Sequence, residues 1–330
     1  MESRRVLVNE VSPRDGLQNQ VTHLSLADKL ALIDALVAAG ITAIEATSFV
    51  SPKAIPQLAD ADLLFPRLPC RERVNYSALV PNARGLDRAL NAGVEEIAVV
   101  LSATDTMNLR NVNLSLVDTR RACADVIAAA DARGIRKKAY IAVAFTCPFE
   151  GKVAADRVMA LTTEMFACGA DEVVIADTIG AANPREVHEL LGACANQFGA
   201  ERIAAHFHDT RGFALANAWA ALSVGIRRFD TSIGGLGGCP FAPGAAGNLA
   251  TEDFVLMAEQ CGFATGISVP ALRAAVALAE RLTKRPLGGR TTAWLQAQDL
   301  KQQPSRELAD ADNQTRHDSM TDFPRSSRAQ

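Results

Sequence analysis

Several features that would place this sequence in a special class are missing. No apolar run approaches the roughly 20 residues that a membrane-spanning helix needs. The net charge is only -3, and the pI is about 6.0, so no overall basic character points to nucleic acid. The seven cysteines are scattered and form no C-x-x-C pair, which indicates reduced cytosolic thiols. Residues 1–5 pass directly into an apolar segment, so we expect a cytoplasmic protein without a signal or transit peptide.

What is present is an alternation of short apolar segments with longer helical ones. The chain has 330 residues, 48% of them hydrophobic, enough for a sizeable core. Eight segments are typical of strands: 6–11, 43–47, 74–80, 96–101, 139–145, 172–176, 202–208 and 228–232. Segments with helical period are 25–39, 84–92, 116–132, 155–168, 184–197, 213–223, 251–261 and 271–282.

Eight strands that alternate with helices predict an α/β protein with a (β/α)8 (TIM) barrel and additional C-terminal helices. A doubly wound sheet is the alternative, but it favours a glycine fingerprint after the first strand, and none is present there. We expect residues 1–298 to form a single domain. Residues 299–330 are polar and show no periodicity, so we predict a disordered tail.

A pair of histidines ends the seventh predicted strand. Residues two apart on a strand point to the same face, so His206 and His208 would lie side by side while Phe207 points away. Two imidazoles at fixed spacing are a common start to a metal site. The alternative is that one or both are buried histidines satisfied by backbone groups.

Other polar residues follow the ends of other predicted strands. In a barrel of this type the carboxyl ends of the strands build the active site. Asp15, His206, His208 and Asn248 would then meet at one mouth and offer two nitrogen and two oxygen ligands. Open positions beside such ligands suit Mg²⁺ or Mn²⁺ better than a closed zinc site.

Each feature also has a structural explanation. Arg14 and Asp15 could form a surface ion pair in a turn, and Glu45 could be a solvated carboxylate. Asp177 could be a turn residue, and the glycine-rich stretch 234–247 could be a plain flexible loop. The functional interpretation rests on their convergence at one end of the barrel.

The chain resembles the 3-hydroxy-3-methylglutaryl-CoA lyases, within a wider metal-dependent barrel family that includes isopropylmalate synthase. The matching stretches are VSPRDGLQN (11–19), IEATSFVSPK (44–53), CPFEG (147–151), DTIG (177–180), HFHDT (206–210), GLGGCP (235–240) and GNLATED (247–253). The glycine loop that carries Cys239 is quite specific to the lyases. The Arg-Asp-Gly and His-x-His motifs are shared across the wider family.

The resemblance implies a retro-Claisen cleavage of 3-hydroxy-3-methylglutaryl-CoA, or a close branched 3-hydroxyacyl-CoA, to acetyl-CoA and a 3-oxo acid such as acetoacetate. Such a lyase serves leucine degradation and ketone-body formation, and a homodimer is common among its relatives. The implied cofactor is Mg²⁺ or Mn²⁺, and the implied partner is a small acyl-CoA rather than nucleic acid or a membrane.

The resemblance also implies roles for single residues. They are metal ligation by Asp15, His206, His208 and Asn248; catalysis by Cys239, Arg14 and His206; and substrate binding by Arg14, Glu45, Ser48, Asn111 and Asp177. Cys239 would transfer a proton with help from His206, and Arg14 would face the thioester oxygen.

The sequence departs from the lyase pattern at a few places. Phe207 stands where Cys is frequent, and Arg211 stands where Tyr is frequent. We expect Phe207 to face the helices as a packing change. Arg211 would be solvated, or would meet an acyl carboxylate or a CoA phosphate.

Two other functions stay open at this point. An acetyl-CoA-condensing synthase of the same barrel family would not need the thiol of Cys239. A non-catalytic binding barrel would tolerate loss of Arg14, Asp15 or a histidine, and none is lost.

Overall fold

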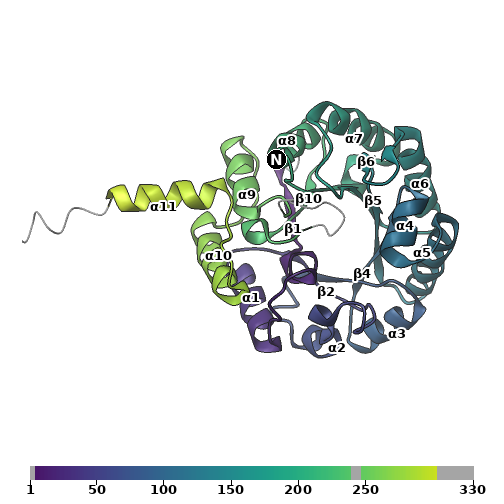
Figure 1. Ribbon diagram of the computed structural model, residues 1–330, viewed down its shortest axis with the longest axis horizontal. Helices are drawn as coiled ribbons and strands as arrows, with labels where there is room; N and C mark the ends of the chain where they lie inside the picture. Colours follow the sequence, from purple (N-terminus) through teal and green to yellow (C-terminus); the bar gives the residue numbers. More distant parts are fainter. Residues whose placement is uncertain (1–3, 239–246, 303–330) are drawn as a thin grey trace, which may run out of the picture.

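The structure is a computed structural model that describes residues 4–238 and 247–302. Its centre is a closed barrel of eight parallel strands, which confirms the predicted (β/α)8 architecture (Figure 1). The strands are β1 (Leu7–Glu10), β2 (Ala43–Ser48), β3 (Asn75–Leu79), β4 (Glu96–Ser102), β5 (Arg136–Ala142), β8 (Glu172–Asp177), β9 (Ile203–Phe207) and β10 (Arg228–Thr231). They close in the order β1-β10-β9-β8-β5-β4-β3-β2, so chain neighbours pair all round the barrel.

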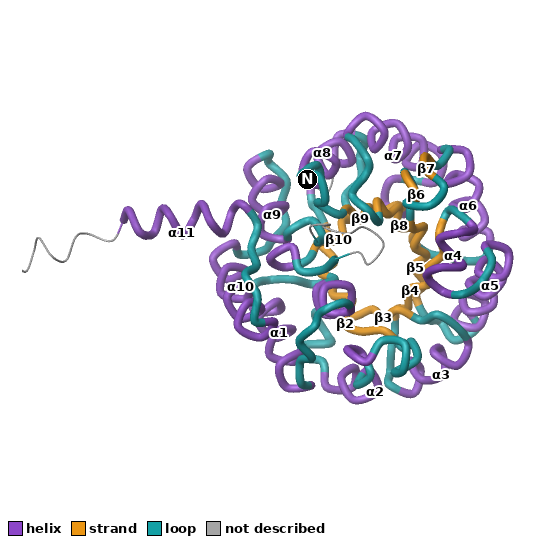
Figure 2. Tube along the Cα trace, in the orientation of Figure 1, coloured by secondary structure: helices purple, strands orange, loops and turns teal. Residues whose placement is uncertain are grey.

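Helices form a ring around these strands, except the last one, which runs away from the barrel (Figure 2). They are α1 (Leu26–Ala38), α2 (Ala61–Leu64), α3 (Ala83–Asn91), α4 (Asp105–Val112), α5 (Leu116–Asp131), α6 (Ala155–Ala167), α7 (Pro184–Phe198), α8 (Ala214–Ser223), α9 (Thr251–Gln260), α10 (Val269–Thr283) and α11 (Arg290–Gln302). Capping boxes begin α1 at Ser25 and α7 at Asn183, where a side chain accepts from the third helical amide. A short hairpin, β6 (Thr146–Cys147) with β7 (Gly151–Lys152), projects from the β5–α6 connection.

The apolar core has two parts, as strand alternation requires. The larger part lies between strands and helices, and it contains Ile203, Ala205 and Phe207 of β9. The smaller part, which includes Ala204 and Tyr140, forms a separate cluster from the opposite strand faces. Phe207 therefore packs toward the helices as predicted.

Several strands end earlier than the sequence predicted, and two of these differences concern the site. β5 ends at Ala142 because Val143 adopts a positive φ of 49°, so residues 143–145 do not continue the strand. β9 ends at Phe207, and His208 instead forms an isolated antiparallel bridge with Asn248. This second difference brings the loop after β10 against the end of β9.

The C-terminal helices extend beyond the prediction. α9 and α10 were expected, but α11 was not, and it runs away from the barrel in Figure 1. It continues to Gln302, past the predicted start of the polar tail at 299.

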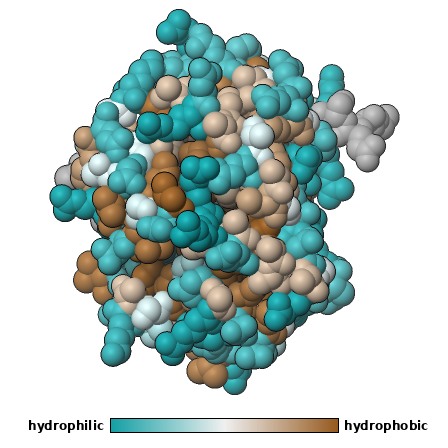
Figure 3. Space-filling model, turned by 90° about the vertical axis from the view of Figure 1, so that its right-hand side faces the viewer, coloured by the Kyte–Doolittle hydropathy of each residue, from teal (hydrophilic) through white to brown (hydrophobic). Residues whose placement is uncertain are grey.

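The opposite side of the molecule, where α5 and α6 lie, is mostly polar with scattered apolar side chains (Figure 3). Within the described chain, every helix is too short or too polar to cross a membrane.

Candidate metal centre

Asp15 is presented by a π-helical turn, Ser12–Gly16, that follows β1 directly. The amides of Asp15 and Gly16 both donate to the carbonyl of Val11, at 2.8 and 3.2 Å. Wide turns of this kind recur at functional sites because they re-aim a side chain. Here the turn carries the Asp15 carboxylate toward the end of β9.

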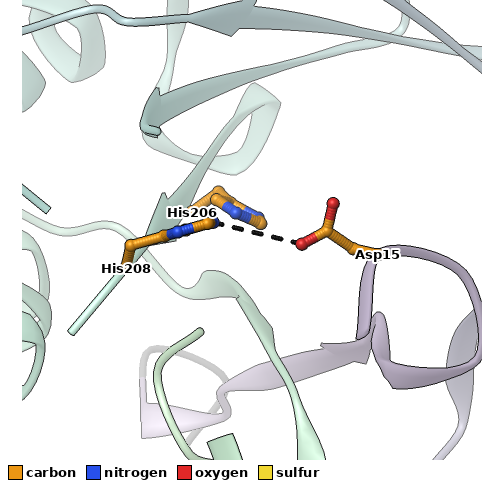
Figure 4. Close-up of side chains that lie close together, drawn as sticks. All are labelled: Asp15, His206 and His208. Atoms are coloured by element: carbon orange, nitrogen blue, oxygen red, sulfur yellow. Dashed lines mark ion pairs between the residues drawn. The ribbon is translucent and has the colours of Figure 1, made fainter. Parts of the chain in front are cut away.

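Asp15, His206 and His208 form a compact cluster of ligand atoms. One ligand atom from each residue lies within 4.8 Å of the others, and the side chains point toward one another (Figure 4). His208 Nε2 is 4.0 Å from Asp15 Oδ2, and the two imidazole centroids are 5.2 Å apart. The prediction that the imidazoles of His206 and His208 lie side by side is therefore confirmed.

Asn248 joins the cluster from the loop after β10. Its Nδ2 donates to Asp15 Oδ2 at 2.9 Å and to the carbonyl of Leu236 at 3.1 Å. Its Oδ1 is buried and has no hydrogen-bond partner among the described residues. A buried carbonyl oxygen is costly to leave unpaired. A divalent cation would satisfy it, so the donor set of two imidazoles, a carboxylate and an amide oxygen fits such an ion.

The electrostatics prepare these groups for a cation. Burial alone would raise the pKa of the Asp15 carboxyl, but Arg14 and both imidazoles outweigh it and lower that pKa to about 2. Burial and the neighbouring His206 lower the pKa of His208 to about 4. Metal ligands must be deprotonated to bind. An ionised Asp15 and a neutral His208 meet that requirement near neutral pH.

Arg14 lies between two carboxylates at the edge of the cluster. Its Nη1 is 2.7 Å from Asp15 Oδ1, and its Nε and Nη2 are 2.7 and 2.6 Å from Glu45 Oε2. The Arg14–Asp15 ion pair considered from the sequence therefore forms, but Arg14 is buried, so it is not a surface pair. Glu45 is also buried, so it is not the solvated carboxylate that was the alternative. Nε and Nη2 of Arg14 both face the single oxygen Oε2 of Glu45, which restricts the orientation of the planar guanidinium.

A cavity of about 200 Å³ opens next to these residues. Its lining combines polar groups, among them Arg14, Asp15, His206 and His208, with apolar side chains such as Met107 and Val112. Asn111, predicted to bind substrate, lines the same cavity from α4. A concave site with a few convergent polar groups in an apolar wall is the usual form of a small-molecule site.

Two other predicted substrate residues make different contacts. The oxygens of Asp177 accept from the amides of Ala181 and Ala182 at 2.8 and 2.9 Å, so this carboxylate shapes the loop after β8. Ser48 is buried, and its hydroxyl donates to the carbonyl of Leu79 at 3.3 Å. Neither residue is among those that line the cavity. Cys239 lies outside the described residues, although its neighbour Gly238 lines the cavity.

Arg211 is exposed, as expected for a solvated charge, and it also bonds to a neighbouring loop. Its guanidinium donates to three successive carbonyls of the β8–α7 loop, those of Gly180, Ala181 and Ala182. It also lies over the ring of Phe213, 5.3 Å from the centroid. Arg211 therefore holds the β8–α7 loop together with an exposed side chain.

Sequence reasoning also missed groups that support the site. Asp230, buried on β10, accepts at Oδ2 from His206 Nδ1 at 3.0 Å. Burial would lower the pKa of His206, but this carboxylate raises it. Tyr140 lines the cavity from β5, and its buried hydroxyl interacts with Asp230. Both lie inside predicted strands, where alternation alone could have indicated a face toward the barrel interior.

Comparisons with known proteins agree with this geometry. The family model described as HMGL-like matches residues 5–278. A hydroxymethylglutaryl-CoA lyase of Bacillus subtilis strain 168 is 43% identical over 287 residues, 87% of this chain and 96% of that protein. A Pseudomonas aeruginosa protein named 3-hydroxy-3-isohexenylglutaryl-CoA/hydroxymethylglutaryl-CoA lyase is 42% identical over 269 residues, 82% of this chain and 90% of its own length.

Solved structures show the same relationship. An HMG-CoA lyase from Acinetobacter baumannii, solved in complex with coenzyme A and 3-methylmalate, superposes with a TM-score of 0.85 at 38% identity. The match covers 88% of this chain and 95% of that one. The chain therefore belongs to the HMGL-like family, and it is a carbon–carbon lyase of the hydroxymethylglutaryl-CoA lyase type.

Proposed function

We propose that this protein cleaves 3-hydroxy-3-methylglutaryl-CoA, or a close branched 3-hydroxyacyl-CoA, to acetyl-CoA and a 3-oxo acid, and that the reaction depends on Mg²⁺ or Mn²⁺. The observation that carries the proposal is the cluster of ligand atoms of Asp15, His206 and His208 beside the cavity. Asn248 donates from Nδ2 to Asp15, and its own Oδ1 is buried without a partner among the described residues. These four residues would hold the cation. When bound, the cation supplies positive charge that polarises substrate oxygens.

The reaction requires two proton movements around one broken bond. The C2–C3 bond of the acyl group breaks as the C3 hydroxyl loses its proton, and the resulting acetyl-CoA enolate takes up a proton at C2. The protein must therefore stabilise negative charge on the thioester oxygen and supply groups for both transfers.

We assign Arg14 to the stabilisation of the negative charge that develops on the thioester oxygen. Arginine carries more N–H donors than its contacts with Asp15 and Glu45 use, and Arg14 lines the cavity. Because Glu45 restricts the orientation of the guanidinium, the remaining donors are preorganised for a thioester oxygen. We assign Glu45 to this orienting role and Asn111 to direct contact with substrate.

Cys239 is the group that we assign to proton transfer. The assignment comes from its place in the glycine loop, and Gly238 beside it borders the cavity. A thiol has a usual pKa of about 8.5, within reach of general acid–base work when its surroundings help. His206 would assist indirectly, as a residue of the cation site.

Ser48 and Asp177 would act on the substrate indirectly. Ser48 bonds to the carbonyl of Leu79, and Leu79 lines the cavity. Asp177 holds the loop that follows Thr178, another residue of the cavity wall. We propose both as residues that position the wall of the substrate site.

Product analysis with a panel of 3-hydroxyacyl-CoA thioesters and Mn²⁺ tests the proposed substrate. Acetyl-CoA and acetoacetate are expected from the 3-hydroxy-3-methylglutaryl thioester. Cys239→Ser should then lower kcat about 10²- to 10⁴-fold while KM and Mn²⁺ affinity change little. Cleavage only of other thioesters would refute the named substrate, and a near wild-type kcat in Cys239→Ser would refute the role of the thiol.

The homodimer implied by the resemblance and the cytoplasmic location expected from the sequence are further parts of this proposal. Light scattering of the purified protein tests the first, and fractionation of the source cells tests the second. A monomer, or recovery outside the cytoplasm, would contradict them.

A further inference from the structure

Asp230 and His206 form a buried pair beneath the cation site. Their side chains are 3% and 8% exposed, and Asp230 Oδ2 lies 3.0 Å from His206 Nδ1. The pair is fixed by the sheet, because Asp230 is the register partner of His206 between β10 and β9. The contact therefore does not depend on a loop conformation.

Asp230 is itself held from the other side. Asn9 on β1 is its register partner there, and Asn9 Nδ2 donates to Asp230 Oδ1 at 2.7 Å. Asn9, Asp230 and His206 thus form one row across three neighbouring strands. Oδ1 of Asp230 therefore faces Asn9 and Oδ2 faces His206, which determines the orientation of the carboxylate.

This row determines which nitrogen of His206 carries hydrogen. An aspartate carboxylate accepts hydrogen bonds, so the contact with Asp230 Oδ2 requires the hydrogen on Nδ1. The neutral ring then has its lone pair on Nε2. A ligand histidine whose other nitrogen donates to a carboxylate is fixed in tautomer and ring orientation.

We propose that Asp230 is a positioning residue that commits His206 to the Nδ1–H tautomer, so that Nε2 is reserved for the divalent cation. The inference rests on the proposed function for the identity of that cation, and it refines the role of His206. Nδ1 is engaged by Asp230, and Nε2 cannot bind a cation and exchange a proton with substrate at the same time. Proton transfer during turnover is then the task of other groups.

Asp230→Asn offers a nearly isosteric test. Because Asn9 donates to one oxygen, the amide NH₂ of the variant would face His206 Nδ1 and favour the Nε2–H tautomer. Asp60→Asn is the matched control, since Asp60 pairs with Lys29 at 2.6 Å and contacts neither histidine. Histidine-selective ¹⁵N NMR of the metal-free protein, with a His206→Gln spectrum for assignment, reports the tautomer across a pH series. Calorimetry with Mg²⁺ reports affinity.

The expected wild-type spectrum shows His206 as Nδ1–H once its ring is neutral. Asp230→Asn should shift it toward Nε2–H and weaken Mg²⁺ binding about 10- to 100-fold, as losses of ligand-orienting groups do. Asp60→Asn should change neither reading. A wild-type Nε2–H ring would overturn the inference even if Asp230→Asn does not fold, and so would a folded variant with wild-type Mg²⁺ affinity. A wild type with the expected tautomer and Mg²⁺ affinity that cleaves no thioester would refute the proposed function while supporting this inference.

Discussion

Gly247→Ala tests whether the loop backbone places Asn248 in the cation site. A Cβ at Gly247 would overlap the carbonyl oxygen of Gly235 and lie 3.1 Å from the amide nitrogen of Gly237. Both are backbone atoms, so no side-chain rotation relieves the clash, and the chain must move beside Asn248. Overpacking of this kind typically costs about 1–3 kcal/mol of stability. Displacement of a ligand should weaken Mg²⁺ binding by about 10-fold or more.

The assay is Mg²⁺ calorimetry combined with thermal unfolding of the metal-free protein. Gly238→Ala is the matched control in the same loop, because no described atom lies within 4 Å of a Cβ at Gly238. We expect this control to bind Mg²⁺ as the wild type does. If Gly247→Ala also kept wild-type affinity, the loop backbone would not determine the site, or Asn248 would not be a ligand.

Three further results are expected. Arg211→Ala removes donors to three loop carbonyls and should lower the unfolding free energy by about 1 kcal/mol or more. Arg211→Lys should not restore this stability, because an ammonium group lacks the planar fork of a guanidinium. An unchanged melting temperature in Arg211→Ala would contradict the role of Arg211 in the loop. Burial raises the pKa of Glu10 from 4.5 to about 7. The protonated Glu10 side chain therefore contributes fully to stability below pH 4.5, and this contribution is lost as the pH rises through about 7. The unfolding free energy should fall by about 3 kcal/mol over this range. Glu10→Gln cannot ionise and should flatten the fall in melting temperature between about pH 5 and 8, whereas an unaltered pH profile would count against this assignment. Truncation after Gln302 removes most of the predicted polar tail and should leave kcat and melting temperature nearly unchanged; a loss of several degrees would show that the tail docks.

Local sequence patterns predicted most of the barrel. The alternation of β and helical segments depends on side-chain periodicity, which is a property of each segment alone. The same argument placed His206 and His208 on one strand face, because a period of two requires it. It failed at Val143, where a residue that usually favours strands has a positive φ that the surrounding loop imposes.

The rest of the site depends on contacts between distant segments. The partnership of Asp230 with His206 follows from the register of β9 against β10, which only the closed barrel fixes. Asp177 matches a substrate motif, yet both of its oxygens meet amides of its own loop, a conformation that composition does not specify. The contacts of Arg211 could not be predicted either, because the three carbonyls that it binds belong to a loop about 30 residues earlier in the chain.

We propose that the lyase works through a divalent cation held by Asp15, His206, His208 and Asn248. The most direct test is formation of acetyl-CoA and acetoacetate from 3-hydroxy-3-methylglutaryl-CoA by enzyme stripped with EDTA, before and after Mg²⁺ or Mn²⁺ is added back. We expect no product from the stripped enzyme and recovery of activity on addition of either ion, with little recovery in His208→Ala at an ion concentration that saturates the wild type. Full activity of the metal-stripped enzyme would contradict metal-dependent cleavage.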